Sequence, residues 1–193
     1  MLEHLDKQLF LFLNSANSPF WDSVMHFLSR IIVWIPLYLL ILIYLGFRYK
    51  KKFLVIVLFI AVAITLSDQI SVIFKNSVMR LRPCHDPSLQ GLVHLLNGEC
   101  GGIYGFVSSH AANAFNAALL SLLLIRRTWY SIFILFWASA VSYSRIYLGV
   151  HYPGDVLAGI ILGVLIGSMI FILYQLTDKY YLQKVRYFKQ EKE

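Results

Sequence analysis

Three short segments of the chain hold residues that could bind and transfer a phosphate. In chain order they are Lys75, Arg82, Ser108, His110, Arg145, His151 and Asp155. A phosphate needs several donors around its oxygens, and three cations in one place supply them. A histidine can attack phosphorus when a carboxylate binds its other ring nitrogen and fixes the neutral tautomer. Asp155 follows His151 closely enough for that role, so the segments together predict phosphoryl transfer.

The second and third segments are also typical of helix starts. Serine is a preferred residue before the first helical turn, which suits Ser108, and the main-chain N–H of Ser109 would then point outward. Proline favours the first helical position. Pro153 therefore places Asp155 near the third position and His151 just before the helix. Helix N-termini attract phosphate, so both starts favour anion binding.

The elements that must position these residues are membrane helices. The chain has 193 residues, is 59% hydrophobic and 14% charged, and has a mean hydropathy of +0.66, which is too apolar for an ordinary soluble domain. Apolar stretches near the length needed to cross a bilayer occur at 31–47, 53–74, 111–125, 128–144 and 156–176. We therefore expect a single all-α integral-membrane domain over 1–193, a polytopic helix bundle.

The N-terminal segment 1–22 has a different pattern. Leu2, Leu5, Leu9, Phe12 and Leu13 recur at helical spacing, which favours an amphipathic helix at the membrane interface. The segment lacks the basic start and apolar core of a signal peptide. It could instead supply a sixth hydrophobic helix, so the bundle is expected to have five or six spans.

Basic residues predict the orientation of the bundle. Three clusters fall on one side of the predicted spans: Arg48, Lys50, Lys51 and Lys52; Arg126 and Arg127; and Lys179, Lys184, Arg186, Lys189 and Lys192. Lys and Arg are retained on the cytoplasmic side, so the loop 75–107 and the core motifs within 75–155 are expected outside. Basic residues exported against this bias favour an anionic ligand, and anionic lipid headgroups are the alternative. Basic residues confined between apolar runs do not indicate nucleic acid, although the net charge is +7.

Three further residues bear on the site. Cys84 and Cys100 lie in the outer loop, where a disulfide is plausible, and two free thiols are the alternative. Asp68 lies two helical turns before Lys75, so it could orient Lys75 or form a buried ion pair with it. The sequence has neither paired short Cys spacings nor an HExxH motif, and we expect no metal and no other cofactor.

At these residues the chain resembles the type 2 phosphatidic acid phosphatase family, whose motifs are KxxxxxxRP, PSGH and SRxxxxxHxxxD. The resemblance implies that His151 attacks phosphorus to give a phosphohistidine, that His110 protonates the departing alkoxide, and that Asp155 orients His151. It also implies that the phosphate oxygens are held by Lys75, Arg82, Ser108, Ser109 and Arg145. The second motif departs from the family, with Val107 for proline and Ser109 for glycine, which matters if the backbone there needs a positive φ.

The resemblance implies a lipid phosphatase of a bacterial inner membrane with its site facing the periplasm. Expected substrates are lipid A, undecaprenyl diphosphate or phosphatidylglycerophosphate. We favour lipid A because Arg80, His85 and His94 of the outer loop could meet a polar sugar. A transporter is the alternative from another class, but its site would lie nearer the bilayer midplane. A haloperoxidase with a similar site is disfavoured by the spans. The expected partners are the lipid substrate and the bilayer, with no obligate protein.

Overall fold

A computed structural model describes residues 2–182, so Lys184, Arg186, Lys189 and Lys192 lie outside the described residues. The α-helices are α1 (Leu2–Ser15), α2 (Pro19–Ser29), α3 (Ile35–Tyr49), α4 (Phe53–Val78), α5 (Ser109–Ile125), α6 (Thr128–Tyr147) and α7 (Pro153–Thr177). A π-helix, Asp178–Leu182, continues α7. Within residues 2–182 there is no strand, only an isolated bridge between Leu81 and Tyr104. The all-α prediction is confirmed.

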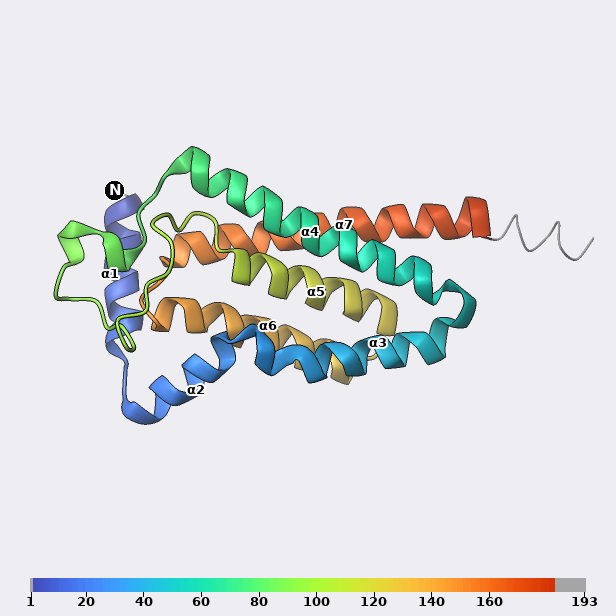
Figure 1. Cartoon of the computed structure of the whole chain (residues 1–193), viewed down its shortest axis with the longest axis horizontal. Helices are drawn as coiled ribbons and strands as arrows, with labels where there is room; N and C mark the ends of the chain where they lie inside the picture. Colours follow the sequence, from blue (N-terminus) through green and yellow to red (C-terminus); the bar gives the residue numbers. More distant parts are fainter. Residues whose placement is uncertain (1, 183–193) are drawn as a thin grey trace, which may run out of the picture.

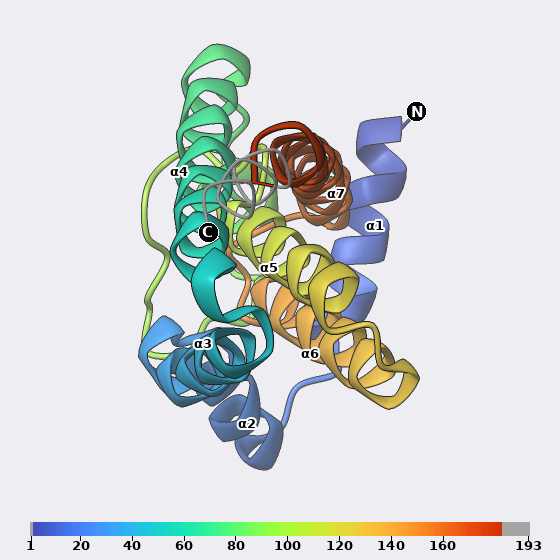
Figure 2. The ribbon, with the colours of Figure 1, turned by 90° about the vertical axis from the view of Figure 1, so that its right-hand side faces the viewer.

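Helices α3 to α7 run along the long axis of the molecule, and α5 lies in the middle of them (Figures 1 and 2). Helix α5 packs against α4, α6 and α7, and most closely against α7. Small residues permit this contact: Gly159 and Gly163 of α7 face the backbone of Ser108 and Ala112. Close approach through small residues is typical of helix pairs in membranes. It brings the start of α5 beside the start of α7.

The outer helices expose apolar side chains along their length, as lipid contact requires. Leu40 and Phe47 on α3 and Leu54 and Leu58 on α4 are more than half exposed. Within residues 2–182, two helical stretches are long and apolar enough to cross a membrane, Ile31–Val78 and Pro153–Tyr180. The first turns back on itself at Lys50–Lys52 and holds both α3 and α4. Helix α4 is about 39 Å long, which exceeds the bilayer's hydrocarbon thickness.

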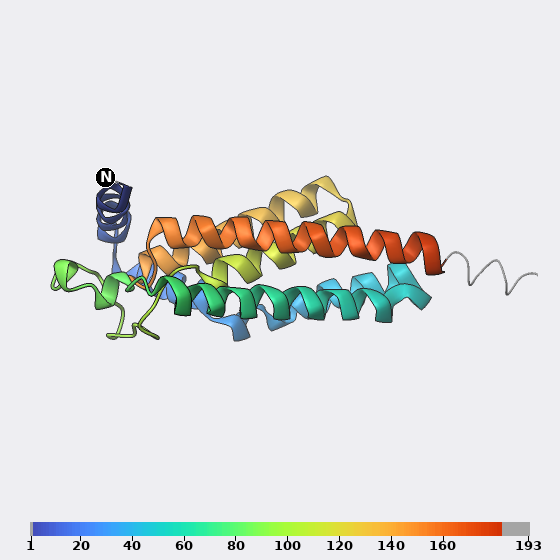
Figure 3. The same ribbon diagram turned by 90° about the horizontal axis from the view of Figure 1, so that it is seen from above.

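The predicted N-terminal amphipathic helix is present as α1, but it is shorter than the segment 1–22. The chain breaks after Ser15, and α2 begins at Pro19 with Ser18 capping it. Helix α1 lies across one end of the bundle, as Figures 1 and 3 show. Two of its side chains are buried: Phe10 packs edge-on against Tyr152, and Asn14 donates to the carbonyl oxygen of Tyr147. Helix α1 is therefore part of the packed structure and covers the end where α7 begins.

The two ends of the bundle differ in charge as predicted. The α3–α4 turn and the α5–α6 connection lie at one end together with the end of α7 (Figure 1). Lys52 and Asp178 form an ion pair there. The loop from Met79 to Ser108 and the turn between α6 and α7 lie at the other end. Helix α4 continues through Val78, so Lys75 lies in its last turn and not in the loop.

Candidate active site

Backbone and side-chain hydrogen bonds join the three sequence segments at the end of the bundle covered by α1. The N–H of Ser108 donates to the carbonyl oxygen of Asp155 at 3.0 Å, which ties the start of α5 to the start of α7. The N–H of His151 donates to the carbonyl oxygen of Arg145 at 3.2 Å. The Lys75 ammonium donates to the Ser109 hydroxyl, which links α4 to α5. Local helix-start chemistry and the α5–α7 contact therefore assemble the site.

His151 and Asp155 face each other at the start of α7. The distance from His151 Nδ1 to Asp155 Oδ2 is 3.6 Å, longer than a hydrogen bond. The N–H of Tyr152 donates to the same Oδ2 at 3.0 Å, so Asp155 caps the helix from the third position as expected. His151 is only 2% exposed, and its Nδ1 has no hydrogen-bond partner in residues 2–182. Catalytic pairs are often this loose without substrate.

Burial lowers the pKa of His151 well below its ordinary value, and the positive charges of Arg82, Arg145 and Lys75 lower it further. A group whose pKa lies below 6.5 is mostly deprotonated at neutral pH. The imidazole is therefore neutral in the free protein. A neutral ring has a lone pair on one nitrogen, which is the state that a nucleophile needs.

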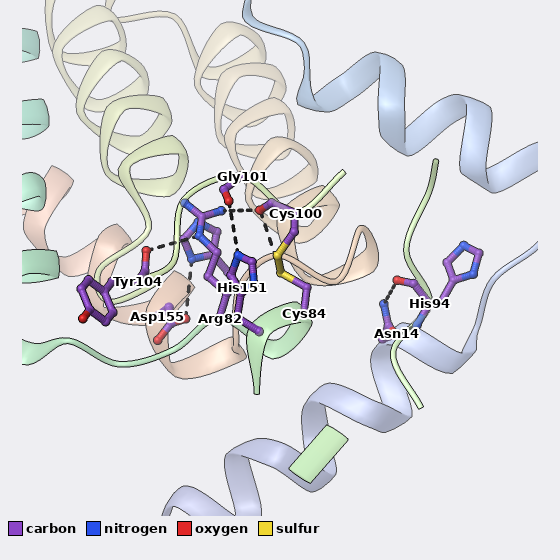
Figure 4. Close-up of a disulfide and its surroundings, with 10 residues drawn as sticks. Asn14, Arg82, Cys84, His94, Cys100, Gly101, Tyr104, His151 and Asp155 are labelled. Atoms are coloured by element: carbon purple, nitrogen blue, oxygen red, sulfur yellow. Dashed lines mark hydrogen bonds and ion pairs between the residues drawn. A yellow bond between two sulfur atoms is a disulfide. The ribbon is translucent and has the colours of Figure 1, made fainter. Parts of the chain in front are cut away.

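The loop that carries the disulfide holds Arg82. The Arg82 guanidinium donates to the carbonyl oxygens of Tyr104 at 3.3 Å and Cys100 at 3.2 Å, and the structure has a disulfide between Cys84 and Cys100. Figure 4 shows Arg82 between this disulfide and the His151–Asp155 pair. The third cation, Arg145, lies on α6 and donates to the hydroxyl of Ser29 on α2. Each cation is thus held by a different element.

The two serines of the second segment are placed as helix-start residues. Ser108 is fully buried and its hydroxyl oxygen accepts from the N–H of Ala111 at 3.4 Å, so it caps α5. Its φ is −72°, and Ser109 is not among the residues with positive φ. The glycine of the family motif is therefore not required here for backbone conformation. The Ser109 hydroxyl also lies 2.6 Å from that of Ser71.

Two predictions about neighbouring residues are wrong. His94 does not reach outward to meet a sugar: its ring contacts Asp22 at 2.8 Å and packs against Tyr147. The predicted ion pair between Asp68 and Lys75 does not form, because the Lys75 ammonium donates to Ser109 instead; the alternative, that Asp68 helps to orient Lys75, stays a prediction. His85 is exposed and lies 3.3 Å from the carbonyl oxygen of Gly101, so it remains at the surface of the loop.

Arg80 is the main residue of this region that sequence reasoning misplaced. Instead of facing a sugar, its guanidinium donates to Asp155 Oδ1 at 2.8 Å and to Asp6 Oδ2 at 2.7 Å. It also stacks over the ring of Tyr152, 4.1 Å from the centroid. Asp6 in turn accepts from the N–H of Gly154 at 2.8 Å. Arg80 thus occupies one oxygen of Asp155 and leaves the other toward His151.

Candidate metal ligands gather at one place in residues 2–182. Atoms of Cys84, His85 and Cys100 lie within 4.8 Å of one another. The two sulfurs are bonded to each other, so neither can serve as a thiolate ligand. These residues do not fit a metal in this state, and metal-independent activity stays a prediction.

Known proteins resemble this chain along most of its length. A model of the PAP2 superfamily matches residues 53–179. A lipid A 4'-phosphatase of Bacteroides thetaiotaomicron is 43% identical over 183 residues, covering 92% of this chain and 81% of that protein. A lipid A 4'-phosphatase of Porphyromonas gingivalis is 32% identical over 88% of this chain and 73% of its own. The crystal structure of Aquifex aeolicus LpxE is 27% identical and superposes with a TM-score of 0.68, covering 86% of this chain and 94% of that one.

Proposed function

Because this chain belongs to the PAP2 superfamily and is a phosphoric-ester hydrolase of the membrane, we propose that it removes a phosphate from lipid A. The observation that supports lipid A as the substrate is the 43% identity to a lipid A 4'-phosphatase along 92% of the chain. The phosphate at the 4' position is accordingly the one that we propose is transferred to His151. We also propose that 1–193 is one domain of a bacterial inner membrane and that its site faces the periplasm. The basic clusters at the opposite end of the bundle support this orientation.

In the proposed reaction the neutral ring of His151 attacks phosphorus and the bond from phosphorus to the 4' oxygen breaks. The bound phosphate dianion stabilises the imidazolium form of His110, which then gives its proton to that departing oxygen and becomes neutral. Asp155, close to the other ring nitrogen at 3.6 Å, compensates the positive charge that develops on His151. Water then attacks the phosphohistidine, releases inorganic phosphate and restores His151.

The three cations stabilise the phosphoryl group in the proposed mechanism. Lys75, Arg82 and Arg145 neutralise the charge on the phosphoryl oxygens during transfer, as donors fixed before the reaction do. The N–H groups at the start of α5, where Ser109 begins the helix, add donors, while Ser108 caps that helix. The three cations come from α4, the outer loop and α6, so the site forms only when the bundle is folded.

Substrate choice is tested with the purified protein in detergent micelles. We expect kcat/KM for hexa-acylated lipid A bisphosphate to exceed that for undecaprenyl diphosphate and phosphatidylglycerophosphate by about tenfold or more, a difference of about 1.4 kcal/mol in transition-state binding. Mass spectrometry of the product identifies the 4' position. The His151→Ala variant is the control for contaminating phosphatases. A higher kcat/KM for either of the other lipids would contradict the proposed substrate.

Arg80→Gln is expected to lower kcat by about 10- to 100-fold with little change in KM, because the buried Asp155 loses a charged partner and its second oxygen is no longer held toward His151. Arg80→Lys should recover only part of the loss, since one ammonium cannot bridge Asp155 and Asp6 as a guanidinium does. Arg127→Gln, at the exposed opposite end, is the matched control. Unchanged kcat in Arg80→Gln would show that Asp155 does not depend on this contact.

A further inference from the structure

A small cavity lies beside His110, between α2, α3, α4, α5 and α6. It has a volume of about 160 Å³, and its lining includes the polar residues Ser29, Asp68, Ser109, His110 and Asn113. Trp34 and Tyr38 of the N-terminal half of the bundle form part of its wall. The phosphoryl chemistry proposed above uses His110 but not Asp68, Asn113 or the two aromatic residues.

Two polar groups of this cavity, the Asp68 carboxylate and the Asn113 side-chain oxygen, lack protein partners within residues 2–182. Among residues 2–182 nothing donates to the carboxylate of Asp68; the Ser71 hydroxyl bonds only its main-chain oxygen, at 2.7 Å. The side-chain oxygen of Asn113 is buried without a hydrogen-bond partner. A carboxylate inside a membrane bundle is costly unless it binds something, and such residues commonly mark a ligand path. The cavity therefore has unused acceptors and needs a ligand rich in donors.

The aromatic wall has a fixed orientation. Trp34 and Tyr38 both pack edge-on against Trp137, with ring centroids 5.5 Å and 5.9 Å from it. The Trp34 indole N–H donates to the carbonyl oxygen of Leu28 at 2.8 Å, so its polar edge is already occupied. Flat apolar faces beside unused acceptors match a sugar ring, whose C–H faces are apolar and whose hydroxyl groups are donors.

The position of the cavity agrees with the leaving group of the reaction. In phosphoryl transfer the attacking and departing atoms lie roughly in line on opposite sides of phosphorus. His110, as the proposed acid, marks the departing side. A second cavity of about 210 Å³ is lined by Arg145, Cys100 and Gly101 and does not include His110. The group that leaves with the oxygen therefore emerges into the cavity that holds Asp68 and Asn113.

We propose that the Asp68 cavity binds the sugar ring that carries the departing oxygen. Asp68 accepts hydrogen bonds from ring hydroxyl or amide N–H groups, Asn113 bonds a neighbouring polar group, and Trp34 with Tyr38 packs against the ring. This proposal rests on the proposed function and adds that the protein selects its substrate by the sugar, not only by the phosphate. A site built for hydroxyl groups discriminates strongly against ligands that lack them.

The test compares two lipid phosphates in the full-length protein. Lipid A bisphosphate has the sugar, whereas the diacylglycerol of phosphatidic acid has no free hydroxyl besides the one being released. We expect Asp68→Leu to lower kcat/KM for lipid A by about 10- to 100-fold and Asn113→Leu by about 3- to 30-fold, and both to change kcat/KM for phosphatidic acid by less than about threefold. Gln69→Leu, the exposed neighbour on α4, is the matched control and should change neither.

The outcomes separate the two proposals. Equal losses on both lipids in Asp68→Leu would overturn the sugar site and assign Asp68 to general support of Lys75. Wild-type protein that hydrolyses phosphatidic acid but not lipid A would overturn the proposed substrate itself. If Asp68→Leu does not fold, as judged by gel filtration and thermal unfolding in detergent, Asp68→Asn gives the same comparison with a smaller expected difference. Selective loss on lipid A in either variant supports the sugar site.

Discussion

Replacing His151 with glutamine is expected to reduce phosphate release by about 10⁴-fold or more, the scale seen when a nucleophile is removed. Glutamine has a similar length and polarity, so the buried position 151 keeps its packing and its N–H bond to the Arg145 carbonyl oxygen. It has no lone pair able to attack phosphorus. The cations would still bind the substrate, so KM should change by less than about tenfold and the loss of activity should appear in kcat.

Rapid quench with substrate carrying a ³²P label measures the intermediate directly. Wild-type protein should retain label that is stable to base and lost in acid, the behaviour of phosphohistidine, and His151→Gln should retain none. His4→Gln, an exposed histidine on α1, is the matched control and should label normally. Label retained in His151→Gln, or activity above about 1% of wild type, would place the nucleophile elsewhere.

The parts of this site that the sequence predicts are those encoded by nearby residues. Pro153 begins α7 and Asp155 caps it from the third position, both as expected from helix-start chemistry. Ser108 caps α5 for the same reason. The basic residues at 48–52, 126–127 and 179 lie at one end of the bundle, because each pair of antiparallel helices returns the chain to the same end.

The contacts of the N-terminal helix have no comparable local signal. Asp6 and Arg80 are 74 residues apart, and Asn14 donates to the carbonyl oxygen of Tyr147, 133 residues away, at 2.7 Å. Such pairs depend on how the helices pack, which periodicity does not specify. The apolar stripe of 1–22 correctly predicts an amphipathic helix, and its Leu2, Leu5, Leu9 and Phe12 are exposed on α1. It does not predict that Phe10, outside the stripe, is buried against the protein, because a stripe identifies one face of a helix but not what the other faces contact.

Asp68 shows the same limit inside a single helix. Its spacing from Lys75 correctly predicts a shared region of α4, yet the ammonium of Lys75 binds Ser109 of α5. Whether two side chains on one helix pair depends on competing partners from neighbouring helices. The unpaired carboxylate of Asp68 indicates a ligand site because it lines a cavity.

Replacing His110 is expected to lower activity by an amount that depends on how readily the leaving group of the substrate departs. We expect His110→Gln to lower kcat/KM for a lipid phosphate by about 10³-fold, because an alkoxide leaves poorly without a proton and general acids contribute about 10²- to 10⁴-fold. With p-nitrophenyl phosphate, whose phenolate leaves readily unprotonated, the loss should be less than about tenfold. His110 lies at the start of α5 and lines the Asp68 cavity, where this proton is needed.

His151→Gln is the internal comparison for this experiment, since loss of the nucleophile should suppress turnover of both esters to the same extent. The parameter kcat/KM is the right one, because it covers the steps up to the first departure of the leaving group and not the later hydrolysis of the phosphohistidine. If His110→Gln loses as much activity on p-nitrophenyl phosphate as on lipid A, His110 binds phosphate instead of donating a proton. The leaving group would then no longer be assigned to the Asp68 side of the site.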